Sequence, residues 1–122
     1  MVNKMENIYE FALLLDLYGQ LLTQRQYEIL DLHYNNDYSL GEIAEHLGIS
    51  RQGVYDNLKR GKEILINAEK KLKLLEKHFV LKSIAEKILY TVECINIENM
   101  VDDDRKKVGM IKDYVNKLLE TI

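Results

Sequence analysis

A short segment near the middle of the chain carries side chains that can read nucleic acid. Ser50 is followed by Arg51 and Gln52, and then by Tyr55 and Lys59. Arginine and glutamine can make paired hydrogen bonds to guanine and adenine edges in a major groove, and lysine can reach phosphate. The candidate nucleic-acid-binding residues are therefore Arg51, Gln52, Tyr55, Lys59, Arg60 and Lys62.

Other patterns that could support chemistry are weak by comparison. The three histidines, at positions 33, 46 and 78, lie far apart and lack cysteine or carboxylate neighbours at metal-ligand spacing. Asp102–Asp104 lacks the alternating ligands, the glycine and the distal glutamate of an EF-hand. The sequence has no glycine-rich phosphate loop and no local signature of a catalytic triad. We therefore expect no enzyme, no metal site and no cofactor.

The candidate residues lie on a predicted helix-turn-helix over residues 39–60. The capping-box sequence Ser39–Glu42 predicts a short helix over residues 40–47. Gly48 favours a tight turn, and Ser50 is suited to cap the following helix. Helix-turn-helix docking places the first side chains of that second helix against the bases. The motif is thus a candidate reader of DNA or RNA.

The same motif supports a second interpretation, as a surface for protein contacts. Helix-turn-helix pairs also serve simply as packing units. Phosphate would repel Asp56 on the supposed reading face, and Asn57 takes a position that related motifs usually fill with an apolar residue. The net charge is −3, and the basic excess is limited to residues 39–77, with eight Lys and Arg against six Asp and Glu. Nucleic-acid binding and a protein-interaction module both stay open.

Further helices are predicted from apolar spacing. The first is expected from about Glu6 to Tyr18, and the second follows the capping-box sequence Thr23–Gln26. Asp102–Asp104 should open the last helix. The tyrosines at positions 9, 18, 27 and 34 are expected to pack in the core.

The absence of proline and the small number of glycines, six, favour an all-α fold. We predict a helix-turn-helix domain over residues 1–62, followed over residues 63–122 by a long helix and a C-terminal helical extension that mediates association.

An apolar stripe over Val54–Phe79 alternates spacings of four and three residues, as a heptad repeat does. It predicts that the second helix of the motif continues to about His78. The stripe can pack within the chain, or it can pair with another copy and space two recognition helices. We expect a homodimer with Leu72 and Leu75 in its interface. The pattern leaves open whether residues 80–97 continue this helix.

The composition predicts a protein of the cytoplasm. No apolar run approaches the roughly 18 residues that span a bilayer, and the N-terminus lacks a signal-peptide pattern, so no membrane association is expected. The single cysteine, Cys94, cannot form an internal disulfide. This fits a reducing compartment and predicts an isolated buried thiol.

Several segments resemble known families. Thr23–Glu28, Ser39–Glu45 and Ile49–Gln52 resemble region four of bacterial sigma factors, which reads promoter DNA. Ser50-Arg-Gln-Gly-Val-Tyr-Asp-Asn-Leu-Lys-Arg60 more closely resembles the signature of the YlxM-type helix-turn-helix proteins, small proteins of Gram-positive bacteria. Genes of that family commonly lie beside those for the signal recognition particle GTPase and its receptor. The resemblance implies a regulatory role in the signal recognition particle pathway, through DNA or RNA or through a protein of the particle.

Overall fold

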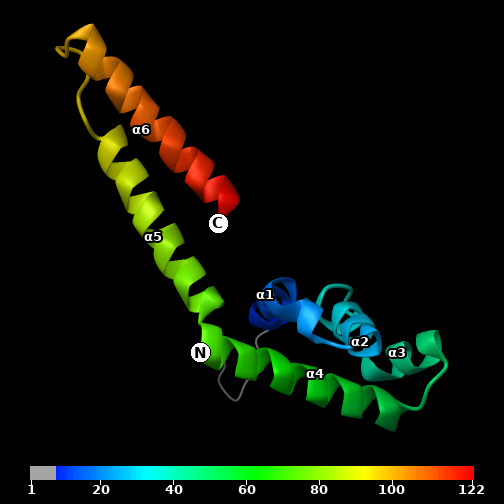
Figure 1. The fold of residues 1–122 in the computed structure, drawn as a ribbon. Helices are drawn as coiled ribbons and strands as arrows, with labels where there is room; N and C mark the ends of the chain where they lie inside the picture. Colours follow the sequence, from blue (N-terminus) through cyan, green and yellow to red (C-terminus); the bar gives the residue numbers. More distant parts are fainter. Residues whose placement is uncertain (1–7) are drawn as a thin grey trace. The chain divides into compact units, whose positions relative to one another are not determined.

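The computed structural model describes residues 8–122, which form six α-helices, one short 3-10 helix and no strand (Figure 1). The elements are α1 (Ile8–Tyr18), η1 (Gly19–Leu21), α2 (Gln24–Tyr34), α3 (Leu40–Leu47), α4 (Arg51–Leu72), α5 (Leu74–Glu93) and α6 (Asp102–Thr121). The predicted all-α class is confirmed. The expected start of the first helix near Glu6 lies outside the described residues.

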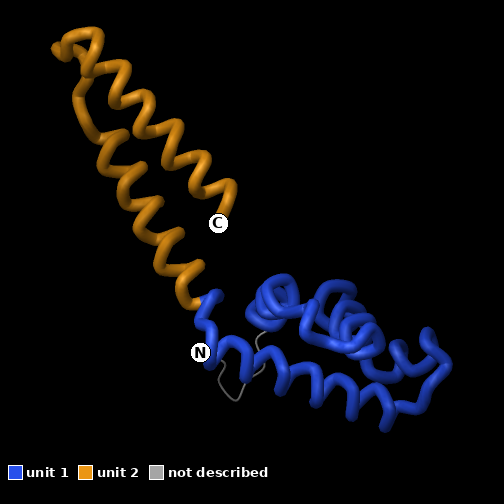
Figure 2. The backbone as a smooth tube through the Cα atoms, in the orientation of Figure 1, with its two compact units in different colours: residues 1–75 blue, residues 76–122 orange. Residues whose placement is uncertain are grey.

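The chain divides into two compact units, residues 1–75 and residues 76–122 (Figure 2). Unit 1 contains α1 to α4 and the first two residues of α5, and unit 2 contains the rest of α5 together with α6. The division lies after Leu75, further along the chain than the boundary after Lys62 predicted from the sequence.

Capping boxes explain where two helices of unit 1 begin. Thr23 Oγ1 accepts a hydrogen bond from the Gln26 N–H (3.1 Å), and the Thr23 N–H donates to Gln26 Oε1 (3.0 Å). Ser39 and Glu42 make the same reciprocal pair at α3, at 3.1 and 3.0 Å. The Ser39 N–H holds the pKa of the Glu42 carboxyl below its usual range, so the ionised carboxylate keeps this hydrogen bond at neutral pH.

The core of unit 1 is built around α4, which contacts α1, α2 and α3. Val54, Leu58, Leu65 and Ala68 are buried in it, so this part of the predicted heptad stripe packs within the chain. The rings of Phe11 and Tyr34 stack in the same core with centroids 5.1 Å apart. The stripe on α4 is therefore covered by its own domain from Val54 to Ala68, whereas Leu72 at the end of the helix is 51% exposed.

The four tyrosines expected in the core divide into two pairs. Tyr18 and Tyr34 are buried, as predicted. Tyr9 and Tyr27 are 69% and 42% exposed, so the prediction was wrong for them. Tyr9 and Tyr27 follow the spacing of the core tyrosines along the sequence, but their side chains lie on the solvent-exposed sides of α1 and α2.

Gly61 lies where α4 passes α2. A Cβ atom at this position would lie only 2.8 Å from Cδ1 of fully buried Leu30. We expect Gly61→Ala to lower the free energy of unfolding by about 1 kcal/mol, because Leu30 must shift within a packed core. The matched control is Gly109→Ala in α6, where nothing lies within 4 Å and alanine should add about 0.5–1 kcal/mol. Urea unfolding followed by circular dichroism measures both, and a stabilised Gly61→Ala protein would contradict the close approach.

The predicted continuation of the long helix to His78 is wrong, because α4 ends at Leu72. Lys73 adopts the left-handed conformation (φ 55°), and its N–H bonds to the Glu69 carbonyl at 2.9 Å. Non-glycine residues adopt this conformation infrequently. The next helix, α5, begins at Leu74 and includes most of residues 80–97, which therefore do not continue α4.

A buried polar cluster holds the first amides of α5. The Tyr18 hydroxyl donates to Glu69 Oε1 (2.7 Å) and accepts from the Leu74 N–H (3.1 Å). The same glutamate oxygen accepts from the Leu75 N–H (3.0 Å). Glu69 is 3% exposed, as is Leu75, which belongs to the core of unit 1. The cluster thus supplies acceptors for amides that the start of a helix leaves unpaired, which accounts for the break at Lys73.

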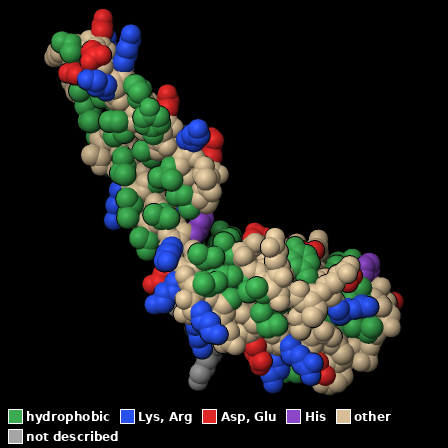
Figure 3. Space-filling model, in the orientation of Figure 1, with side chains coloured by type: hydrophobic (Ala, Val, Ile, Leu, Met, Phe, Trp, Pro, Cys, Tyr) green, Lys and Arg blue, Asp and Glu red, His purple; other side chains and the backbone are tan. Residues whose placement is uncertain are grey.

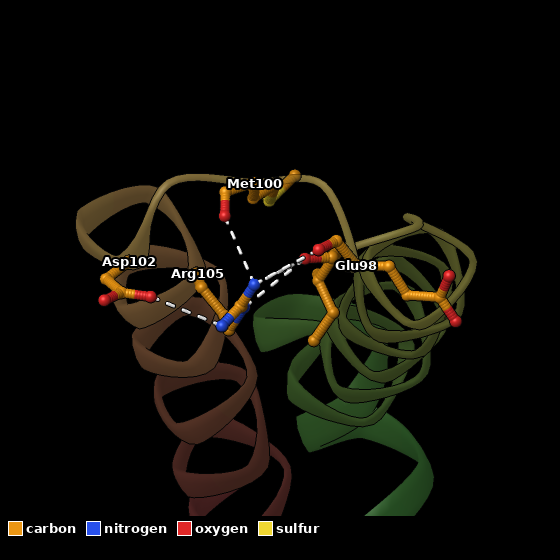
Figure 4. Close-up of polar contacts among 5 residues, drawn as sticks. Glu98, Met100, Asp102 and Arg105 are labelled. Atoms are coloured by element: carbon orange, nitrogen blue, oxygen red, sulfur yellow. Dashed lines mark hydrogen bonds and ion pairs between the residues drawn. The ribbon is translucent and has the colours of Figure 1, made fainter.

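In unit 2, α5 and α6 run antiparallel (Figure 1). Arg105 organises the loop between them: its Nη2 donates to the carbonyls of Glu98 (3.3 Å) and Met100 (3.2 Å), and its Nη1 contacts the Asp102 carboxylate at 3.3 Å (Figure 4). The last helix starts at Asp102, as predicted. Cys94 is exposed rather than buried, which corrects that expectation.

Candidate nucleic-acid interface

The predicted helix-turn-helix is formed by α3 and α4. Gly48 ends α3 in the left-handed conformation (φ 68°), and the Ile49 N–H bonds to the Ala44 carbonyl at 3.1 Å. Ser50 Oγ then accepts a hydrogen bond from the Gly53 N–H (3.0 Å), which caps α4 as predicted. The turn therefore holds the first residues of α4 at the surface beside α3.

Arg51 is exposed at the first position of α4, and its guanidinium lies over the first turn of α3. A Cβ atom placed on Gly41 would lie 3.0 Å from Nη2 of Arg51, so a side chain there would displace the end of this exposed arginine slightly. Helix N-termini carry free N–H groups and partial positive charge. The arginine thus adds a full positive charge at this end of α3, where the ionised Glu42 carboxylate already caps the first turn. This packing could not be predicted from the sequence, because Gly41 occupies an ordinary helical position.

The Gln52 side chain is oriented by the residue one turn later. Gln52 Nε2 donates to Asp56 Oδ1 at 3.0 Å, and both side chains are exposed. This leaves the Gln52 carbonyl oxygen and its second N–H free to face a ligand. Asn57, which departs from the usual apolar pattern, is half-buried and donates to the Gly53 carbonyl at 2.8 Å. Both unusual residues of the motif therefore have local partners.

The structure brings five of the six candidate residues to the exposed surface at the start of α4. Tyr55 is 49% exposed, and Lys59 and Arg60 are exposed as well as Arg51 and Gln52. The sixth, Lys62, is half-buried, with Nζ lying 5.1 Å from the centroid of the Phe11 ring. That cation–π contact holds Lys62 against the core and separates it from the others.

The histidines near the motif serve local structure. His33 Nδ1 lies 2.9 Å from the Tyr38 carbonyl, and the Tyr38 ring meets His46 edge-on with centroids 5.6 Å apart. These contacts fix the loop before α3. Among residues 8–122, no group of three or more His, Cys, Asp or Glu side chains could hold a metal ion. In the same range, no helix is long and apolar enough to cross a membrane.

Comparison with known proteins gives consistent matches. Residues 5–108 match the model of the UPF0122 family, the YlxM / p13-like helix-turn-helix proteins. A UPF0122 protein of Acetivibrio thermocellus is 53% identical over 117 residues, which cover 96% of this chain and 100% of the relative. One of Caldanaerobacter subterraneus is 53% identical over 92 residues (75% and 76%). One of Clostridium kluyveri is 42% identical over 112 residues (91% and 96%).

Proposed function

Because this chain belongs to the UPF0122 family of helix-turn-helix proteins, we propose that it is a non-enzymatic regulatory protein that binds DNA or RNA through the start of α4. The observation that carries the proposal is the arrangement at Ser50. The capped end of α4 presents Arg51 and Gln52 beside the start of α3, and Lys59 and Arg60 follow about two turns later. This is the geometry in which a recognition helix meets a groove.

Each side chain has a distinct role in this proposal. Gln52, held by Asp56, offers a carbonyl oxygen and an N–H to an adenine edge. Arg51 can reach guanine or a phosphate, and Lys59 and Arg60 contact the flanking phosphates. Tyr55 contributes an exposed ring beside them. Lys62 lies outside this contact, because it is held over Phe11.

We also propose that this regulation concerns the signal recognition particle pathway. The support for this step is the resemblance of Ser50–Arg60 to the YlxM-type proteins. It makes the RNA of the particle the first RNA to test, alongside duplex DNA.

A second candidate function is a protein-interaction module that binds a protein of the same particle. The acidic side chains near the reading surface favour it, because Asp56 and Glu63 are both exposed on α4 and the net charge is −3. Phosphate would be repelled by these carboxylates, whereas a basic protein surface would be attracted.

We expect purified protein to bind labelled duplex DNA or the particle's RNA in fluorescence anisotropy, with an affinity that falls steeply as salt rises. Arg51→Ala and Gln52→Ala should each weaken binding by roughly 5- to 150-fold, the loss of about 1–3 kcal/mol expected for a base contact. Lys59→Ala should reduce the slope of log affinity against log salt by about 1, because one phosphate contact is lost.

Lys71→Ala is the charge-matched control, because Lys71 lies in the last turn of the same helix. Its affinity should stay close to that of the unchanged protein. Equal affinities in the Arg51, Gln52 and control variants would exclude the base contacts. Absence of binding at low salt would reject the nucleic-acid proposal and leave the protein-interaction module.

A further inference from the structure

The helical hairpin of unit 2 buries little of its apolar surface. The residues buried in it are Ala85 and Val92 on α5 and Val108 and Val115 on α6, all of them small. Larger apolar side chains on both helices stay about half exposed, in contrast to the close packing of unit 1. Two helices alone cannot enclose such side chains, whereas four helices can.

Six of these exposed apolar side chains lie on one face of the hairpin, which we call the hairpin face. It consists of Leu81, Ile84, Ile88, Ile111, Tyr114 and Leu118, each 41–63% exposed. When each helix is viewed along its axis from its N-terminus, the exposed residues lie at angles counter-clockwise from those of the buried residues. Because α5 and α6 are antiparallel, both sets fall on the same side of the hairpin. Figure 3 shows apolar side chains along the length of unit 2 on that side.

We propose that the hairpin face is the surface through which two copies of this chain associate, so that two hairpins form a four-helix bundle. The six side chains expose on the order of 600 Å², a large part of the roughly 800 Å² that each partner contributes to a standard interface. The neighbouring hollow of about 290 Å³, lined by Ile84, Lys87, Ile88, Thr91 and Val92, adds room for a side chain of the second copy.

The chemistry of the face suits a second copy. None of its six residues is charged, so no like charges oppose each other when two identical faces meet. Ile84 and Ile88, and likewise Ile111 and Leu118, recur at the four- and seven-residue spacings of helices that pack side by side. In addition, α5 and α6 each have 20 residues, so a second hairpin matches the first in length.

This surface differs from the dimer interface expected from the sequence. Leu75 belongs to the core of unit 1, and its own domain covers the stripe on α4 from Val54 to Ala68, so of the two leucines expected in that interface only Leu72 is exposed. The inference is independent of nucleic-acid binding, because it concerns the mass of the protein alone. Two linked helix-turn-helix domains would, if both proposals hold, bind two sites on one nucleic acid.

We expect analytical ultracentrifugation of the full chain to give twice the 14.4 kDa mass of one chain at high concentration. A reductant must be present, because Cys94 is exposed and could link two chains covalently. The double variant Ile84→Glu with Ile88→Glu should raise the dimer dissociation constant by more than about 100-fold. Ile111→Glu on α6 tests the same face independently, and circular dichroism checks that each variant stays helical.

Tyr90→Glu is the matched control, because Tyr90 is 71% exposed and lies on the opposite side of α5. It should keep the dimer mass. If the unchanged protein has the mass of a single chain at high concentration, the proposal is wrong, and the hairpin face is then a candidate surface for binding a different protein. Dimers that persist in folded variants of both helices would also overturn it.

Discussion

Replacing Leu75 with alanine is expected to lower the free energy of unfolding of unit 1 by about 2–5 kcal/mol. Leu75 is 3% exposed and packs with the core residues of α1 and α4, so its removal leaves a cavity. The matched control is Leu72→Ala, three residues earlier, where a 51% exposed side chain should cost less than about 0.5 kcal/mol. Urea unfolding of the two variants measures the difference.

Comparing Leu75→Ala with Leu72→Ala also tests the break between α4 and α5 at Lys73. In an uninterrupted helix, residues 72 and 75 lie three apart and share a face, so the two substitutions would have similar effects. The left-handed residue between them turns one leucine into the core and leaves the other in solvent. Equal losses of stability would contradict that geometry.

Tyr18→Phe is expected to cost about 1–3 kcal/mol at neutral pH, because it removes one hydroxyl that makes two hydrogen bonds. Without it, the Leu74 N–H loses its acceptor and Glu69 Oε1 loses a donor within the buried cluster. Tyr9→Phe is the control on the same helix, since Tyr9 is 69% exposed and should tolerate the change within about 0.5 kcal/mol. Equal effects of the two variants would mean that the cluster contributes nothing to stability.

The pH dependence of this difference has a definite sign. Burial first, and then the hydrogen bond to Glu69, raise the pKa of Tyr18 above its ordinary value of 10.0. The folded protein therefore holds the phenolic proton more tightly than the unfolded chain does. The resulting stability is complete below pH 10.0 and declines as the pH rises through the folded-state pKa. The stability gap between the unchanged protein and Tyr18→Phe should therefore narrow in alkaline solution.

Local signals in the sequence predicted correctly where α2, α3 and α4 begin. Capping boxes at Thr23 and Ser39, the glycine turn at Gly48 and the cap at Ser50 all act within a few residues, and all four are confirmed. The break at Lys73 could not be predicted in this way. It depends on Tyr18 and Glu69, which are far apart in sequence, whereas the local pattern continues without a glycine or a proline.

The candidate site was predictable in part. The type and spacing of Arg51, Gln52, Tyr55, Lys59 and Arg60 identified residues that the structure exposes together. The sequence could not show that Phe11, from a different helix, holds Lys62. It also marked Asp56 only as a repulsive charge, whereas the structure shows that Asp56 orients Gln52.

The buried cluster at the start of α5 also bears on the rates of folding. Its hydrogen bonds join residues 51 and 56 positions apart, so they close only after α1 has docked onto the end of α4. Contacts that form after the transition state slow unfolding and leave the folding rate nearly unchanged. We therefore expect the Tyr18 hydroxyl to lengthen the lifetime of folded unit 1 rather than to shorten the time in which it forms.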